Sequence, residues 1–504
     1  MRLAVLLVAL VSLRAAASNP VLPGDHPDPS VIRTSKGYWA TATTSRWAPI
    51  FPILHSSDLI HWRTAGAVFQ ERPDWAETNF WAPEIAEHKG RYFVYYTAKK
   101  KDGPLCVAVA TATQPAGPYT DHGPLVCQEA GSIDAQPATD EHGQRYLIWK
   151  EDGNSRKQPT PLWAQPLDES GTKLTGEPRE LFRNDASWEG QLVEGPFVLR
   201  RAEWFYLFYS AAGCCGRGCN YALGVARAKS LLGPWEKNPG NPILAGNDMW
   251  KCPGHGSVVE DRRGRTFLLY HAYDPQESIF VGRQGMLDEI AWDSEGWPSI
   301  NGGKGPSSGP RPRGVTFAEE FSGTPSPLLE WPVNQAAKMD TASGWLDLEG
   351  VLAKAPTAMD YFARTVVEGS GGIAAWGDAR NATGLTLSGG KLTLWRRDKG
   401  DEAVLATAET TAQRVHLRFQ STGGNRFAFS YSEDGQKWTD LEPSVDGDHL
   451  PPWDLAVRIA LVGPGRFDFL RTRDARGQAA VSAAAANATT RAPAKRKSKA
   501  RRRR

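Results

Sequence analysis

The feature that most constrains this sequence is a fivefold repeat of a turn followed by an aromatic strand. The turns lie at Gly37, Gly90, Gly143, Glu203 and Gly264, and a short aromatic run follows each of them. Nine positions before each turn stands a polar or aromatic residue, in chain order Asp28, Trp81, Asp134, Glu194 and His255. Successive repeats are 53 to 61 residues apart, slightly above the periods of roughly 20 to 50 residues that are typical of solenoids and propellers. If each repeat is one propeller blade, the five residues form a ring at one mouth of the central channel.

The pattern inside each repeat favours a propeller over a solenoid. Each repeat contains several short β-branched or aromatic runs broken by Gly, Pro, Asn and Asp, as expected for strands linked by hairpins. Long helical periodicity is hard to find after the N-terminus. Radial repetition of four-stranded sheets leaves only short, protected edges. We therefore predict an all-β fold in which residues 18–310 form a five-bladed β-propeller, with a large irregular β-sandwich as the alternative.

The remaining sequence divides into three further parts. A Gly/Pro/Ser-rich stretch, residues 301–310, is interpreted as a linker, and the alternating residues 315–475 predict a second all-β unit, a β-sandwich. Residues 1–17 combine Arg2, an apolar run and three alanines, which predicts a secretory signal and a secreted or periplasmic protein. Residues 476–504 are Ala-rich and then basic, which predicts a disordered tail.

The charge balance depends on that tail. The chain has 59 basic and 56 acidic residues, and nine of the basic ones lie in residues 491–504. Without those nine, the balance is 50 to 56, or −6, so the net charge of +3 belongs to the tail. Such an arm is usually solvated, although it can contact anionic surfaces such as lipids or cell-wall polymers. We expect no specific nucleic-acid partner.

Six cysteines in an exported chain can form disulfides, with fifteen possible pairings if all six take part. Cys106 and Cys127 can bridge neighbouring strands of the second blade. The cluster Cys214, Cys215 and Cys219 is expected to pin a loop near the channel mouth, with Cys252 as a possible partner. Zinc-finger spacing is absent, and catalytic thiol chemistry is not expected.

The chemistry of the ring is carried by its three carboxylates. Acids brought together repel each other, so at least one should have a raised pKa. A protonated acid facing an ionised one is what glycosidic cleavage requires, because one donates a proton to the leaving oxygen while the other activates water or attacks the sugar. The third acid can tune the pKa of the first. Trp81 offers a flat face for a sugar ring.

Five segments resemble, in order, the motifs of glycoside hydrolase family 43: residues 19–30, 80–85, 132–135, 193–196 and 254–257. The resemblance implies a five-bladed propeller of inverting enzymes that act on arabinose- and xylose-containing plant polysaccharides. It also implies that Asp28 is the general base, that Asp134 modulates the pKa of the acid and orients it, and that Glu194 is the general acid.

The same resemblance suggests substrate and cation contacts. Residues 282–287 resemble the family's substrate-contacting arginine region. Arg283 is therefore a candidate for substrate binding, in addition to Trp81. His255 resembles the residue that lies beneath the sugar, often near a cation such as calcium. The alternative for His255 is a hydrogen-bonded channel histidine without metal, and no cofactor is expected to be required. Residues 321–323, 371–376 and 466–470 resemble the lectin-like, concanavalin-like sandwich that is attached to some members.

These expectations lead to a specific hypothesis. Inversion places a water between base and sugar, so Asp28 and Glu194 should lie roughly 6.5 to 9.5 Å apart, with Glu194 protonated and Asp28 ionised in the resting enzyme. We expect an α-L-arabinofuranosidase or β-xylosidase that removes terminal pentoses from plant cell-wall polysaccharide or oligosaccharide. A blocked channel favours this hypothesis, whereas an open groove favours the alternative, an endo-1,5-α-L-arabinanase.

Three other possibilities are weaker. A retaining enzyme of the fructan and sucrose type needs Arg-Asp-Pro and Glu-Cys motifs, and neither occurs in the propeller region. The complete acid set argues against a non-catalytic carbohydrate-binding propeller. An adhesion protein that uses the basic tail would show tail-dependent binding to walls or lipids.

Overall fold

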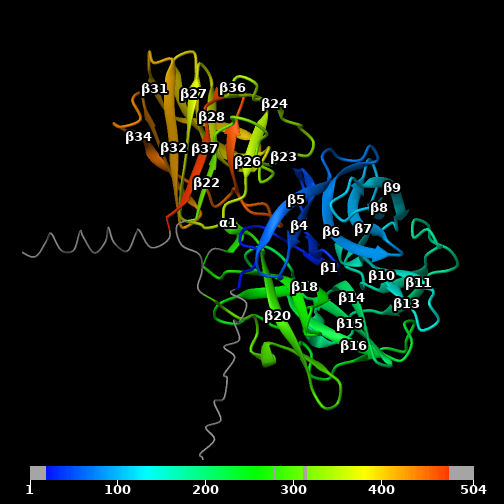
Figure 1. Cartoon of the computed structure of the whole chain (residues 1–504). Helices are drawn as coiled ribbons and strands as arrows, with labels where there is room; N and C mark the ends of the chain where they lie inside the picture. Colours follow the sequence, from blue (N-terminus) through cyan, green and yellow to red (C-terminus); the bar gives the residue numbers. More distant parts are fainter. Residues whose placement is uncertain (1–18, 277, 310–314, 476–504) are drawn as a thin grey trace, which may run out of the picture.

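The computed structural model describes residues 19–276, 278–309 and 315–475. The predicted signal segment 1–17 and tail 476–504 lie outside the described residues. Figure 1 shows two lobes, one built from the blue-to-green part of the chain and the other from the yellow-to-red part. The predicted all-β fold is confirmed, because strands form both lobes and the one α-helix among the described residues, α1 (Ser278–Val281), is a single turn.

Five four-stranded antiparallel sheets form the first lobe, as predicted for a five-bladed propeller. The first two blades contain β1 (Ser30–Thr34), β2 (Gly37–Thr41), β4 (Ile50–Ser56) and β5 (Trp62–Phe69), then β6 (Ala76–His88), β7 (Arg91–Lys100), β8 (Leu105–Ala112) and β9 (Thr120–Val126). The third and fourth contain β10 (Ser132–Thr139), β11 (Arg145–Glu151), β12 (Leu162–Pro166) and β13 (Arg179–Phe182), then β14 (Val193–Arg201), β15 (Trp204–Ala211), β16 (Ala222–Ala228) and β17 (Glu236–Lys237). The fifth contains β18 (Lys251–Glu260), β19 (Thr266–Tyr273), β20 (Gln284–Trp292) and β21 (Pro298–Ile300).

The first strands of the blades, β1, β6, β10, β14 and β18, contact one another in sequence, and β18 contacts β1 to close the ring. The aromatic second strands pack between neighbouring blades. Tyr95 and Tyr96 of β7, for example, are fully buried on opposite faces of their sheet. The repeat therefore produces a ring because each aromatic strand supplies apolar surface to both of its neighbours.

The second lobe is a two-sheet sandwich. One sheet has nine strands: β22 (Thr316–Glu319), β24 (Lys338–Asp340), β25 (Leu346–Glu349), β27 (Tyr361–Glu368), β32 (Arg414–Thr422), β33 (Arg426–Ser432), β34 (Thr439–Asp446), β36 (Gly465–Phe467) and β37 (Leu470–Asp474). The other has six: β26 (Val351–Lys354), β28 (Gly371–Asp378), β29 (Asn381–Ser388), β30 (Lys391–Asp398), β31 (Asp401–Glu409) and β35 (Arg458–Val462). Leu417 and Phe419 from the first sheet share a buried apolar core with Ile373 and Leu385 from the second.

The sandwich is fixed directly to the first blade. Strand β23 (Trp331–Pro332) pairs with β3 (Trp47–Ala48), so the segment between β2 and β4 contacts the sandwich. Beside this contact, the buried guanidinium of Arg458 lies 2.8 Å from the Asp25 carboxylate and 2.8 Å from the Glu330 carboxylate. This buried ion-pair network holds the loop before β35 close to the propeller.

The predicted linker also packs against the propeller over its described part. Within the described ranges there are also short 3₁₀ helices at Gly153–Arg156, Ser187–Glu189 and Asn301–Gly303. After the last of them, the Ser308 hydroxyl accepts a hydrogen bond from the Trp250 indole at 3.2 Å, and the Ser307 backbone N–H donates to Asp288 at 3.1 Å. Residues 301–309 therefore form an ordered edge of the fifth blade.

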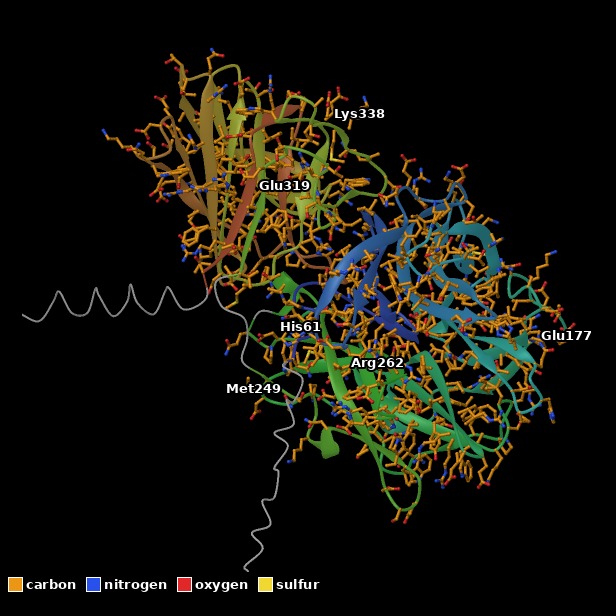
Figure 2. All side chains as sticks on the ribbon, in the orientation of Figure 1. His61, Glu177, Met249, Arg262, Glu319 and Lys338 are labelled. Atoms are coloured by element: carbon orange, nitrogen blue, oxygen red, sulfur yellow. A yellow bond between two sulfur atoms is a disulfide. The ribbon has the colours of Figure 1, made fainter. Side chains whose placement is uncertain are left out.

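Among the described residues, no helix is long and apolar enough to cross a membrane. The large apolar side chains that are exposed are Met249, Leu328, Val404 and Trp453. Figure 2 shows Met249 at the periphery of the propeller, among the side chains of its outer surface. Trp453 is different because it lies over the channel mouth, where it lines a pocket.

Candidate active site

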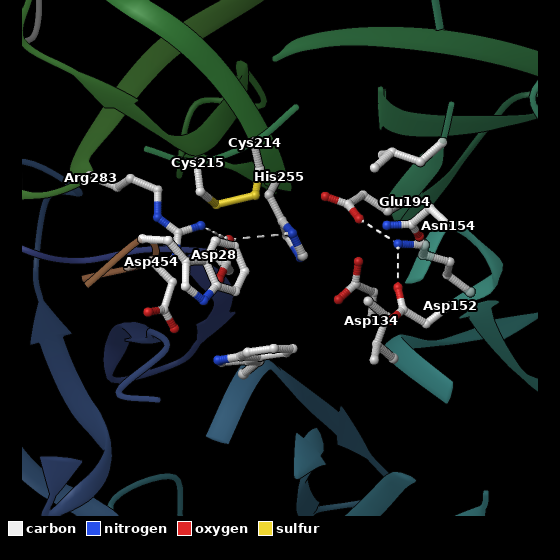
Figure 3. Close-up of a pocket in the computed structure, with 15 residues that line it drawn as sticks. Asp28, Asp134, Asp152, Asn154, Glu194, Cys214, Cys215, His255, Arg283 and Asp454 are labelled. Carbon is white, nitrogen blue, oxygen red and sulfur yellow. Dashed lines mark hydrogen bonds and ion pairs between the residues drawn. A yellow bond between two sulfur atoms is a disulfide. The ribbon is translucent and has the colours of Figure 1, made fainter. Parts of the chain in front are cut away.

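The five ring positions meet in one pocket, as the repeat predicted. The pocket has a volume of about 230 Å³. It is lined by Asp28, Trp81, Ile133, Asp134, Lys150, Asp152, Asn154, Leu192, Glu194, Cys214, Cys215, His255, Arg283, Trp453 and Asp454. Figure 3 shows Asp28 and Arg283 on one side of the pocket, Asp134, Glu194 and Asp152 on the other, and His255 between them.

Irregular backbone turns these side chains into the channel. The pairing register shifts between Ile133 and Gln136 in β10, between Glu194 and Phe197 in β14, and on both sides of Gly254, the residue before His255, in β18. Asp28, Asp134 and His255 have φ angles of 50°, 59° and 49°, in the left-handed region that non-glycine residues rarely adopt. β-Bulges of this kind re-aim side chains and are common beside active sites. At Trp81 and Glu194 the positive φ belongs instead to the next residue, Ala82 and Gly195, so an irregular backbone occurs at or directly after each ring position.

Asp28 is held as an ionised carboxylate. Arg283 donates to its Oδ1 at 2.9 Å, and the Thr43 hydroxyl donates to its Oδ2 at 2.7 Å. Burial alone would raise the pKa of Asp28, but Arg283 and the neighbouring histidines hold this pKa well below its usual range. Burial lowers the pKa of His271 to about 4, and in its neutral form its Nδ1 accepts the Asp28 backbone N–H at 3.1 Å. The predicted ionisation of Asp28 therefore agrees with its surroundings.

Glu194 has a different environment from the one expected. The Lys150 ammonium lies 2.7 Å from its Oε2, and the Tyr221 hydroxyl donates to its Oε1 at 2.8 Å. Burial would raise the pKa of Glu194, but the charge and hydrogen bond of Lys150 lower it overall. The expectation that Glu194 is protonated in the resting state is therefore wrong for this structure, because a buried ammonium stabilises the carboxylate.

The raised pKa belongs to Asp134 instead. Burial raises the pKa of Asp134 to about 6, and the negative charge of Glu194 contributes to this increase. The Gly195 backbone N–H donates to Asp134 Oδ2 at 2.9 Å, and the Asp134 backbone N–H donates to Thr97 Oγ1 at 3.1 Å. One acid of the ring therefore has a raised pKa, as predicted, but it is Asp134 rather than Glu194, and burial contributes more to the increase than repulsion does. The two acids titrate as an interacting pair.

Lys150 was missed by the sequence reasoning. It lies on β11, its side chain is 1% exposed, and it contacts Asp152 at 2.9 Å in addition to Glu194. Burial would lower the pKa of Lys150, but the two carboxylates raise it above its ordinary value. In the sequence Lys150 ends an aromatic strand, where a single lysine gives no signal of a buried ion pair.

The sandwich contributes two pocket residues that were also missed. The Trp453 ring lies 5.9 Å from the Trp81 ring, edge to face, and Trp453 is 53% exposed. Asp454 is buried, its Oδ2 accepts from the Ser45 hydroxyl at 2.7 Å, and its backbone carbonyl accepts from Arg283 at 3.1 Å. The pocket is therefore completed by a loop from the other lobe. The sequence signal was weak, a Trp-Asp pair after two prolines in a segment without strand pattern.

All six cysteines pair. Cys106 and Cys127 are bonded, as suggested, and so are Cys219 and Cys252. The remaining bond joins the adjacent residues Cys214 and Cys215, a pairing that the sequence left open among the alternatives. Both of these cysteines line the pocket.

The donor groups around His255 show whether a cation could bind there. Among the residues that the structure describes, no group of three or more His, Cys, Asp or Glu side chains is arranged to hold a metal ion. His255 Nδ1 lies 3.5 Å from Asp28 Oδ1, which already pairs with Arg283. These side chains do not form a metal-binding set by themselves, so the cation near His255 stays a prediction and no step depends on it.

The chain combines a five-bladed propeller with three buried carboxylates around a pocket that Trp81 and Trp453 line. The model of the glycosyl hydrolases family 43 matches residues 17–298, more than half of the chain, and the chain belongs to this family. The predicted family resemblance is thereby confirmed.

Two curated relatives and one solved structure illustrate the similarity. A xylosidase/arabinosidase of Butyrivibrio fibrisolvens is 30% identical over 306 residues, 57% of each chain. An extracellular exo-α-(1→5)-L-arabinofuranosidase of Cellvibrio japonicus is 27% identical over 58% of this chain and 92% of the relative. The crystal structure of a xylan β-1,4-xylosidase from Bacillus halodurans superposes with a TM-score of 0.78 at 20% identity, over 91% of this chain and 100% of that one. The first of these relatives is matched over little more than half of its length, and the structural match extends across both lobes.

Proposed function

We propose that this protein is a secreted, inverting glycoside hydrolase that removes terminal pentoses from plant hemicellulose or pectin side chains, as an α-L-arabinofuranosidase or β-xylosidase. The observation that supports this best is the pocket itself, in which an ionised Asp28 faces the Asp134–Glu194 pair. A relative named as extracellular is consistent with export.

The roles follow from the environments of the three acids. Asp28 is ionised and held by Arg283 and Thr43, so it is suited to take a proton from a water that attacks the sugar. Glu194 donates a proton to the leaving oxygen from the form of the Asp134–Glu194 pair in which it carries that proton, and the pair takes up a proton from solvent after each turnover. Inversion requires space for that water, and the separation of roughly 6.5 to 9.5 Å between Asp28 and Glu194 stays a prediction.

Release of terminal sugars is favoured over internal cleavage by the closure of the pocket. Trp453 and Asp454, from the sandwich, stand against Trp81 and Arg283 at the channel mouth. The volume of about 230 Å³ is below the roughly 300 to 1,000 Å³ of sites for larger ligands. A polysaccharide chain running through the site would have to pass this loop, so an endo-arabinanase is the second candidate.

Hydrolysis of three substrates tests the proposal: an aryl α-L-arabinofuranoside, an aryl β-xyloside and linear arabinan, with protein that lacks residues 1–17. We expect release of pentose from one aryl glycoside, lost in Asp28→Asn. Glu194→Gln should lose turnover mainly on substrates with poor leaving groups, because an activated aryl leaving group needs no proton. Release of oligomers from arabinan without hydrolysis of the aryl glycosides would change the assignment to an endo-arabinanase. Inactivity on all three substrates would contradict the proposed function.

A further inference from the structure

The pocket contains a feature that the acid chemistry does not use, the disulfide between the neighbouring residues Cys214 and Cys215. Figure 3 shows it beside His255 and Arg283, on the side of the pocket away from Asp134 and Asp152. Both cysteines are partly exposed, so their sulfurs are accessible from the pocket.

The chemistry of this wall differs from the rest of the site. A disulfide offers polarisable sulfur and CH₂ groups, has no hydrogen to donate and accepts hydrogen bonds only weakly. A sugar ring has hydroxyls at its edge and C–H groups on its faces. Carboxylates, Arg283 and Lys150 can bind the hydroxyls, whereas an apolar wall can cover only the C–H surface.

The loop that carries the disulfide is anchored at several points. The bond itself joins two adjacent side chains and closes a small ring that includes their peptide bond. At the base of the loop, the Gly213 N–H donates to Asn220 Oδ1 at 2.8 Å, and the Asn220 N–H donates to the Gly213 carbonyl at 3.0 Å. The second bond, Cys219–Cys252, ties the loop to β18, the strand that carries His255.

The loop also contacts the acid ring and the sandwich. Tyr221, which follows it, donates to Glu194 at 2.8 Å. Arg217 contacts Asp448 of the sandwich at 3.0 Å, and Gly216 lies against the backbone of Trp453. Because the wall is fixed before a ligand arrives, little conformational entropy is lost when a sugar packs against it.

We propose that the Cys214–Cys215 disulfide is a substrate contact that packs against the C–H surface of the terminal sugar and contributes to its affinity. This inference rests on the proposed function only in taking the pocket as the sugar site. The two sulfurs take no part in proton transfer, so their effect falls on binding rather than on the chemical step.

The test compares two double variants, Cys214→Ser/Cys215→Ser and the control Cys106→Ser/Cys127→Ser, which removes a disulfide that does not line the pocket. For the first we expect KM for the aryl pentoside to rise about tenfold, the effect of losing one apolar contact in a pocket, with kcat within about twofold of the wild type. The control should keep both constants. Equal KM values in the wild type and the first variant, or equal losses in both variants, would overturn the inference.

A binding measurement separates this inference from the proposed function. L-Arabinose and D-xylose are titrated against the fluorescence of the pocket tryptophans, which requires no turnover. A wild type that binds a pentose but hydrolyses nothing would defeat the proposed function alone. Unchanged pentose affinity in Cys214→Ser/Cys215→Ser would defeat this inference alone.

A second experiment needs no variant and covers the case in which the double variant does not fold. Native protein is treated with a trialkylphosphine, which is oxidised to its oxide with oxygen from water while the disulfide gains two electrons and two protons. Alkylation and peptide mass mapping then report each opened bond. A saturating pentose should slow opening of Cys214–Cys215 several-fold and leave Cys106–Cys127 unchanged. Equal rates with and without both pentoses would contradict a sugar contact.

Discussion

Replacing Lys150 by methionine should shift the pH dependence of activity, because Lys150 stabilises the ionised form of Glu194. The Lys150 ammonium lies 2.7 Å from Glu194. At an effective dielectric constant of about 20, two unit charges at this distance interact by about 6 kcal/mol. That figure is an upper bound, because Lys150 also pairs with Asp152 and burial disfavours both charges. Carboxylates beside a cation usually have their pKa lowered by about 1 to 3 units.

The direction of the pH shift follows from which protonation state of Glu194 is active. Glu194 must be protonated to donate a proton, so activity is lost as pH rises through the pKa of the Asp134–Glu194 pair. In the wild type the pKa of Asp134 is about 6, and that of Glu194 is lowered, so kcat/KM should fall as pH rises through about 6. Without Lys150 the pKa of Glu194 rises, and the falling limb should move up by about 1 to 3 units.

The assay is kcat/KM for a glycoside with a poor leaving group, measured from pH 4 to pH 9. Lys150→Arg is the matched control, because it keeps the charge and should leave the falling limb within about half a unit of the wild type. A falling limb at the same pH in Lys150→Met and in the wild type would refute the argument that Lys150 sets the protonation of Glu194. Lower activity at all pH values without a shift would indicate a role in packing alone.

Two further predictions concern the contact between the lobes. Trp453→Ala should raise KM for an aryl pentoside about tenfold, as expected for loss of one apolar pocket contact, and should increase activity on arabino-oligosaccharides relative to the aryl substrate; unchanged KM and product pattern would show that the loop does not close the site. Asp25→Ala removes one partner of the buried Arg458, which costs about 3 to 5 kcal/mol for a buried pair. Calorimetry should therefore show a lower Tm for Asp25→Ala than for the control Asp448→Ala, which removes the exposed ion-pair partner of Arg217. Equal Tm values in the two variants would contradict the structural role of Asp25.

The positions of the ring residues were predictable because they depend on local spacing. Each lies nine residues before a turn, and it stands in the first strand of its blade or, for Asp28, just before β1. The register shifts at Asp134 and Glu194 also occur at equivalent places in their blades. Such a repeat survives differences in sequence because every blade must present the same apolar surface to its neighbours.

The electrostatics of the ring were not predictable in the same way. Repulsion among three acids predicted one raised pKa, but the position of the proton depends on Lys150, which is 44 residues from Glu194 in sequence. The charges of the ring alone do not place a cation from β11 beside Glu194. The pKa of an acid depends on every charged or hydrogen-bonding group near it. A motif that identifies the acids therefore does not establish which of them has the highest pKa.

Two non-polar walls of the pocket lie outside the five equivalent blade positions. Trp453 belongs to the sandwich and the Cys214–Cys215 bond to a loop between two strands of the fourth blade, so neither occupies an equivalent blade position. The repeat supplies the charges for the proposed glycoside cleavage, whereas we expect these walls to contact the sugar. Substitutions in the ring should therefore change kcat, and substitutions in the walls should change KM and the choice of sugar. This division explains how one catalytic ring can serve several pentosides, since the residues that select the sugar can vary without disturbing the acids.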